Sequence, residues 1–131
     1  MQSGIKRLLI AVLVVLCVPV LAQATIYWIS TTGSDGNACS AIDGGSDPGV
    51  YKATIRNAWD NCLVAGDSLY IKTGTYVEAI STNTTGLPSG TASNPITIAS
   101  APGNTATWKP VANSPAWDVT RTSYIIFDGI V

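Results

Sequence analysis

Residues 65–76, AGDSLYIKTGTY, carry the strongest local signal for the fold. Residues 69–71 are an apolar and aromatic run of the kind that forms a short strand. Gly74 marks a turn, because glycine adopts backbone conformations that other residues avoid. Residues 76–80 begin a second run of the same kind. The stretch therefore predicts two short strands joined by a tight turn.

The apolar pair in the first of these strands recurs along the chain. Leu69 and Ile71 are followed 27 residues later by Ile96 and Ile98, and 29 residues after that by Ile125 and Phe127. A period of this length indicates a solenoid, in which each repeat is one coil that covers its neighbour. A small antiparallel sandwich also has short strands and frequent turns, and it remains the alternative.

A different period precedes these strands. The apolar residues of segment 55–63 fall at i, i+3, i+4, i+7 and i+8, which predicts one face of an amphipathic helix. Thr54 can cap its N-terminus through the hydroxyl, and Gly66 can adopt the left-handed conformation that ends a helix. The segment before it, residues 31–50, is rich in Gly, Ser, Asp and Asn and is predicted to be a long loop.

Four motifs occur in one order along the chain. They are YWIS with the following GSD (residues 27–35), AGDSLYIKTGTY (65–76), GTASNPITIASAPG (90–103) and SYIIFDG (123–129). Together they resemble the pectate-lyase-like right-handed parallel β-helix family, over nearly all of residues 26–131. The resemblance implies an all-β fold, a right-handed parallel β-helix whose N-terminal cap is the amphipathic helix. It further implies about three coils in residues 25–131 and a domain that continues beyond residue 131.

The same resemblance implies a carbohydrate-active protein, a polysaccharide lyase or hydrolase, whose partner is a polysaccharide or a cell-surface glycan. Family members place catalytic residues and Ca²⁺ on middle coils, so residues 25–131 are expected to hold no cofactor and to be inactive alone. Ca²⁺ would belong to the full-length protein. Two alternatives stay open: a non-catalytic, adhesin-like surface or matrix protein, and a small binding domain that is complete in itself.

The N-terminus has the three parts of a secretory signal peptide. Lys6 and Arg7 precede the apolar run 8–21, and residues 22–24 form a small-x-small cleavage site. Cleavage between Ala24 and Thr25 leaves residues 25–131 in an extracellular, periplasmic or cell-surface protein. The apolar run is short for a bilayer crossing, which takes about 20 residues, so a stable membrane anchor is not expected.

Composition excludes several kinds of site. The chain has no histidine, which rules out a Ser-His-Asp triad, a Cys-His pair and a His-ligated metal within these residues. Its net charge is −1 and it has no basic stripe, so a nucleic-acid partner is not expected. Once Cys17 leaves with the signal peptide, Cys39 and Cys62 most simply form one disulfide. A reactive thiol or a metal pair is the less favoured alternative.

Three groups of residues are candidates for binding a ligand. Each group also has a purely structural explanation. Asp35, Asp43 and Asp47 offer carboxylates for Ca²⁺, although Asp/Gly loops usually only turn. Trp108 and Trp117 are candidates for stacking on sugar rings, although aromatic residues in strands more often pack in a core. Lys72, Lys109 and Arg121 are candidates for meeting an acidic polysaccharide, although isolated basic residues are usually solvated. No residue can be assigned a catalytic role.

Overall fold

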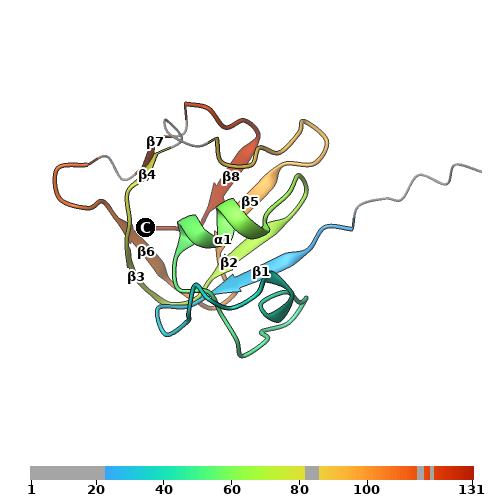
Figure 1. The fold of residues 1–131 in the computed structure, drawn as a ribbon, viewed down its shortest axis with the longest axis vertical. Coiled ribbons are helices and arrows are strands. Elements are labelled where there is room, and N and C mark those ends of the chain that lie inside the picture. Colours follow the sequence, from blue (N-terminus) through green and yellow to red (C-terminus); the bar gives the residue numbers. More distant parts are fainter. Residues whose placement is uncertain (1–22, 82–85, 115–116, 119) are drawn as a thin grey trace, which may run out of the picture.

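The computed structural model describes residues 23–81, 86–114, 117–118 and 120–131 (Figure 1). The signal peptide predicted at residues 1–24 therefore lies outside the described residues, apart from its last two. Strands dominate the described chain, with one α-helix and one short 3-10 helix. In chain order the elements are β1 (Ile26–Ile29), η1 (Cys39–Ala41), α1 (Ile55–Cys62), β2 (Ser68–Ile71), β3 (Gly74–Val77), β4 (Ile80–Ser81), β5 (Ile96–Ser100), β6 (Ala106–Lys109), β7 (Trp117–Asp118) and β8 (Ile125–Asp128).

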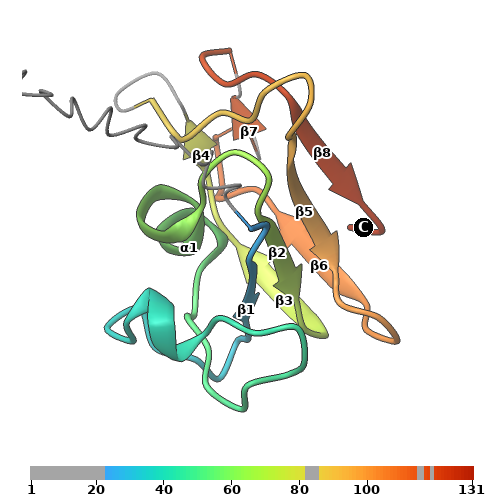
Figure 2. The ribbon, with the colours of Figure 1, turned by 90° about the vertical axis from the view of Figure 1, so that its right-hand side faces the viewer.

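The strands form three parallel sheets. The largest has the order β1-β2-β5-β8, and Figure 2 shows these four strands side by side. The others are the pairs β3-β6 and β4-β7. The register places Leu69 beside Ile98 and Ile98 beside Phe127, so one apolar row crosses three strands of the large sheet. All pairs between these strands are parallel, which excludes the antiparallel sandwich.

The prediction of an all-β right-handed parallel β-helix is wrong. The chain is a small α/β protein, with parallel sheets of four, two and two strands around one helix, and no solenoid is indicated, so a count of coils does not apply. The spacing of the apolar pairs indicated which strands are neighbours. It did not show that α1 shares its core with the sheets, or that each smaller sheet has two strands among the described residues.

The core lies between α1 and the inner faces of the sheets, and Figure 1 shows α1 with strands of all three sheets around it. Trp59 of α1 is fully buried and meets Phe127 of β8 edge to face, with ring centroids 6.1 Å apart. Phe127 also meets Trp108 of β6 at 6.1 Å. Such aromatic pairs add about 0.5–1.5 kcal/mol beyond the area they bury.

The local features predicted for α1 are largely present. The Thr54 hydroxyl accepts a hydrogen bond from the backbone N–H of Asn57 at 3.2 Å. The helix ends at Cys62, one residue earlier than expected, and Gly66 has a φ of 99° beyond that end. The structure contains the predicted disulfide, which joins Cys39 of η1 to Cys62 of α1. By closing a loop of this size it adds about 3 kcal/mol to stability.

The segment between β1 and α1, which contains the predicted loop 31–50, covers one edge of the large sheet. The N–H of Trp28 donates to Ile42 and that of Ser30 donates to Lys52, each at 3.0 Å, so β1 does not end the sheet as a bare edge. Gly33 permits this close approach, because a Cβ there would lie 2.3 Å from the carbonyl oxygen of Lys52. In the part of the chain described, no helix is long and apolar enough to cross a membrane.

Candidate functional site

A shallow groove of about 380 Å³ lies along the outer side of α1 and is here called the polar groove. Its volume falls in the range of small-molecule sites, about 300–1,000 Å³. All its lining residues except one are polar: Asp35, Thr54, Arg56, Asn57, Asp60, Asn61, Glu78 and Ala79. The residues come from three segments far apart in the sequence, so the fold creates the groove.

The amphipathic character of α1 supplies half of this lining. Residues 55, 58, 59 and 62 are buried against the sheets. The remaining positions leave Arg56, Asn57, Asp60 and Asn61 on the opposite side, where they line the groove. Asn57 and Asn61 are one turn apart, and the Asn61 amide donates to the backbone carbonyl of Asn57 at 2.9 Å. This contact fixes one wall of the groove.

Glu78, which follows β3, closes the groove beside the helix N-terminus. Its two carboxylate oxygens accept the N–H groups of Ile55 at 2.8 Å and Arg56 at 2.9 Å. These are orphan donors at the start of a helix, where a negative charge is also favoured by the helix dipole. Burial is the largest influence on the pKa of Glu78 and raises it, although these two hydrogen bonds act in the opposite direction.

Asp35 supplies a second carboxylate from the loop before α1. One of its oxygens accepts the N–H groups of Ala53 and Thr54, both at 3.0 Å, and the other accepts the Thr54 hydroxyl at 2.8 Å. Asp35 and Glu78 thus hold the helix start from two sides. Each of their four oxygens already accepts a hydrogen bond from the protein. The pair is therefore built to position α1, and a general acid–base role would require breaking those contacts.

Asn57 is the residue in the groove with an unmet bonding requirement. Its side-chain oxygen Oδ1 is buried and has no hydrogen-bond partner, and no other buried side-chain nitrogen or oxygen in the described residues shares this condition. A buried acceptor without a partner costs about 1–3 kcal/mol. Asp60, one turn along, is exposed and brings a carboxylate to the same groove.

Trp108, one of the two tryptophans proposed for sugar stacking, does not line this groove. Trp108 is 9% exposed, lies opposite Tyr76 in the β3-β6 register, and donates its ring N–H to the backbone carbonyl of Glu78 at 3.1 Å. It is a core residue whose ring faces are covered by protein. Trp117 belongs to β7 by its backbone, and its side chain lies outside the described residues.

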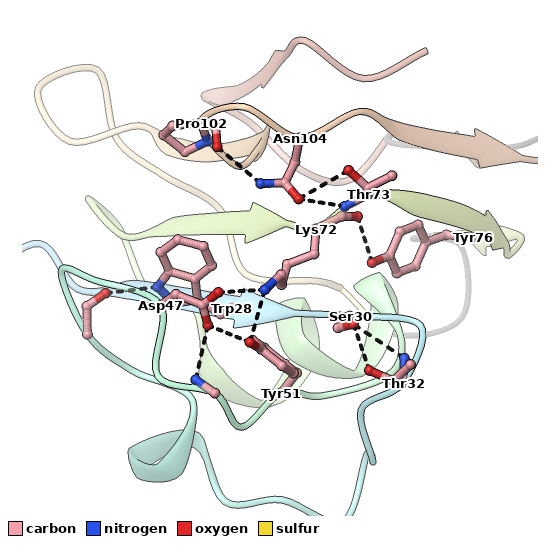
Figure 3. Close-up of polar contacts among 12 residues, drawn as sticks. Trp28, Ser30, Thr32, Asp47, Tyr51, Lys72, Thr73, Tyr76, Pro102 and Asn104 are labelled. Carbon is pink, nitrogen blue, oxygen red and sulfur yellow. Dashed lines mark hydrogen bonds and ion pairs between the residues drawn. The ribbon is translucent and has the colours of Figure 1, made fainter.

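The three basic residues proposed to meet an acidic polysaccharide have different surroundings. Lys72 forms an ion pair with Asp47, and the Tyr51 hydroxyl lies between them, as Figure 3 shows. The hydrogen bond from Lys72, with a second from Tyr51, lowers the pKa of Asp47 to about 2. Lys109 and Arg121 are exposed on β6 and on the turn before β8. Lys72, one of the three, is thus matched by an acid.

The three loop aspartates proposed for Ca²⁺ have separate structural roles. Asp35 holds the start of α1, Asp47 pairs with Lys72, and Asp43 lies in an isolated antiparallel bridge to Tyr27 of β1. Within the described residues no three acidic or sulfur-bearing side chains gather where they could hold a metal ion.

Sequence reasoning missed Asn57, Asp60 and Glu78. The two helix residues had a signal, since they occupy the polar positions of the predicted amphipathic helix. Glu78 had none, because only the fold brings a residue after β3 against the start of α1.

Comparison of the chain with protein-family models, curated proteins and solved structures finds no match.

Proposed function

We propose that this protein is exported and that its polar groove binds the hydroxyl groups of a glycan. One observation carries the proposal: Asn57, which lines a groove formed mainly by polar residues, has a buried side-chain oxygen, Oδ1, with no hydrogen-bond partner. A turn of the Asn57 side chain would bring that oxygen to the groove surface, where a sugar hydroxyl could donate to it while accepting from a neighbouring donor. Carboxylates and amides such as Asp60 and Asn61 suit the same chemistry.

The charge of the groove favours a neutral glycan over an acidic one. Asp35, Asp60 and Glu78 contribute three carboxyl groups, and Arg56 contributes one guanidinium. A chain of uronic acids would meet repulsion from like charges, which costs affinity and slows encounter. The proposal rests on this groove and on its contacts. It does not depend on the family resemblance.

Binding without cleavage fits the same geometry. A glycosidase needs two carboxyl groups free to exchange a proton or attack the sugar. Asp35 and Glu78, the two acids nearest the helix start, are committed to backbone N–H groups instead. Residues 25–131 are accordingly proposed to bind a glycan and to release no product from it.

The test is calorimetric titration of the secreted protein with neutral oligosaccharides, and with oligogalacturonate for comparison. Asn57→Ala removes the unpartnered acceptor, and loss of one hydrogen bond should weaken neutral-glycan binding up to about tenfold. Asn94→Ala is the matched control, because Asn94 is an exposed asparagine whose side chain contacts only Ser93 among hydrogen-bond partners. It should bind as the wild type does.

Two results would contradict the proposal. One is the absence of binding to every neutral glycan by a folded wild-type protein. The other is equal binding by wild type and Asn57→Ala, which would place the glycan elsewhere. Product release from any of these sugars would contradict the binding-only role while leaving the groove as the site.

A further inference from the structure

Asp67 is a buried acid that the polar groove does not use. It precedes β2 and is 2% exposed. Its oxygens accept the N–H of Thr25 at 2.8 Å and the N–H of Val64 at 2.9 Å. Its own backbone is held by bonds to Val64 and Thr97. Within the described residues no lysine or arginine forms an ion pair with it.

A buried carboxylate normally has a cation beside it, because removing a charge from water costs several kcal/mol. The two backbone N–H groups compensate Asp67 only in part, since each carries a dipole and not a full charge. Thr25, which supplies one of them, is the residue that becomes the N-terminus if the signal peptide is cut after Ala24.

The chain is attached to the fold from Thr25 onward. The Thr25 carbonyl accepts the N–H of Ser68 at 2.9 Å, and Ile26 begins β1 in register with Ser68. Gln23 and Ala24 are exposed, whereas Thr25 is half-buried. The boundary between exposed chain and folded chain thus coincides with the predicted cleavage site.

We propose that removal of residues 1–24 places the new α-ammonium group of Thr25 on the carboxylate of Asp67, so that export completes the fold with an ion pair. The nitrogen atom already lies 2.8 Å from the Asp67 oxygen and would gain a positive charge without moving. A hollow of about 370 Å³ is lined by Gln23, Ala24, Thr25, Ile26, Asp43, Gly44 and Gly45. Cleavage removes Gln23 and Ala24 from this lining, which leaves room for the two additional protons of the ammonium group.

The surrounding charges support a cation at this position. Asp43 lines the hollow, and both Asp67 and Asp43 raise the pKa of the neighbouring Tyr27, after burial. Asp67 therefore contacts the nitrogen directly, and Asp43 lines the same hollow as Thr25. They should raise the α-ammonium pKa above its ordinary value of about 7.7–8.0. A raised pKa stabilises the fold below that range, and the benefit is lost as the pH rises through the folded-state value.

The test compares two secreted chains, the natural one and one with a single serine inserted between Ala24 and Thr25. Mass spectrometry establishes the N-terminus of each. The insertion moves the ammonium group one residue, about 3.8 Å along the chain, and leaves an ordinary amide N–H on Asp67. At pH 6.5 the natural chain should melt about 4 °C higher or more. Its α-amino pKa, followed by NMR, should exceed that of the inserted chain.

Asp67→Asn in both chains separates the ion pair from other effects of the insertion. The difference in melting temperature and the rise in α-amino pKa should both vanish in this background. An N-terminus other than Thr25, equal melting of the first two chains, or a difference that persists with Asp67→Asn would each overturn the proposal. This inference rests on the proposed export, and an N-terminus other than Thr25 would count against both proposals. The other results do not depend on glycan binding, so failure of the ion pair and failure of the groove as a glycan site are distinguishable.

Discussion

The two sides of α1 were shaped by different requirements. One side carries Ile55, Ala58 and Trp59, each fully buried against the sheets. The other carries Asn57 and Asp60, which line the polar groove. The eight residues of α1 therefore contribute both to the core and to half of the groove lining. Residues on the two sides are only one or two positions apart in the sequence.

The buried side of α1 contributes to the stability of the fold, whereas the exposed side lines the candidate site. The apolar side is held by area removed from water, at roughly 25 cal/mol per Å². The polar side contributes little of that kind, and its helix start is instead fixed by Glu78 and Asp35 from elsewhere in the chain. Substitutions on the apolar side should unfold the protein, whereas substitutions at the far end of the polar side should change only what it binds.

The largest expected effect is that of Trp59→Asp. The indole of Trp59 is fully buried, contacts Phe127, and donates its N–H to the Pro88 carbonyl at 3.0 Å. An aspartate would leave a cavity and an unpaired charge in the core, which should cost about 4 kcal/mol or more. Urea unfolding measures the loss. A change within experimental error would show that α1 does not share the core.

The fold could be predicted in part, where the signal is local. The amphipathic period of α1, the Thr54 cap and the disulfide were all recoverable from neighbouring residues and cysteine arithmetic. The spacing of apolar pairs identified the strands that lie side by side, although Leu69 pairs with Ile98 and not with Ile96. The overall architecture was wrong, because no local pattern shows how a helix and three sheets divide one core.

The candidate site was less predictable than the fold. Trp108 has an aromatic ring of the kind that stacks on sugars. Its position in β6, however, places that ring in the core, beside Tyr76. Lys72 and Asp47 each suggested a ligand, and they satisfy one another across 25 residues of chain. The groove itself depends on Glu78 reaching α1, a contact between segments 22 residues apart that no motif records.

A smaller effect is expected from the helix start, and it depends on pH. Because burial raises the pKa of Glu78, the folded protein holds this proton more tightly than the unfolded chain does. Stability conferred by Glu78 should therefore increase as the pH falls through its raised pKa toward about 4.3, and decrease as the pH rises through that window. The measurement is the unfolding free energy of the wild type minus that of Glu78→Gln, determined at several pH values. This difference should decrease as the pH rises. A difference that grows with pH would reverse the sign and contradict burial as the main cause.

The smallest expected effect on stability, with the clearest effect on binding, belongs to Asp60→Asn. Asp60 is exposed on the polar side of α1, immediately after buried Trp59, and lines the groove. Surface substitutions of this kind usually change stability by no more than about 0.5 kcal/mol. The carboxylate would nevertheless be lost as an acceptor for a sugar hydroxyl, so affinity for a neutral glycan should fall by several-fold at an unchanged melting temperature. Asp128→Asn provides the matched control, because Asp128 is an exposed aspartate on β8 outside the groove and should alter neither quantity. If Asp60→Asn lowered the melting temperature together with the affinity, the two sides of α1 would not be separable, and binding could no longer be attributed to the groove alone.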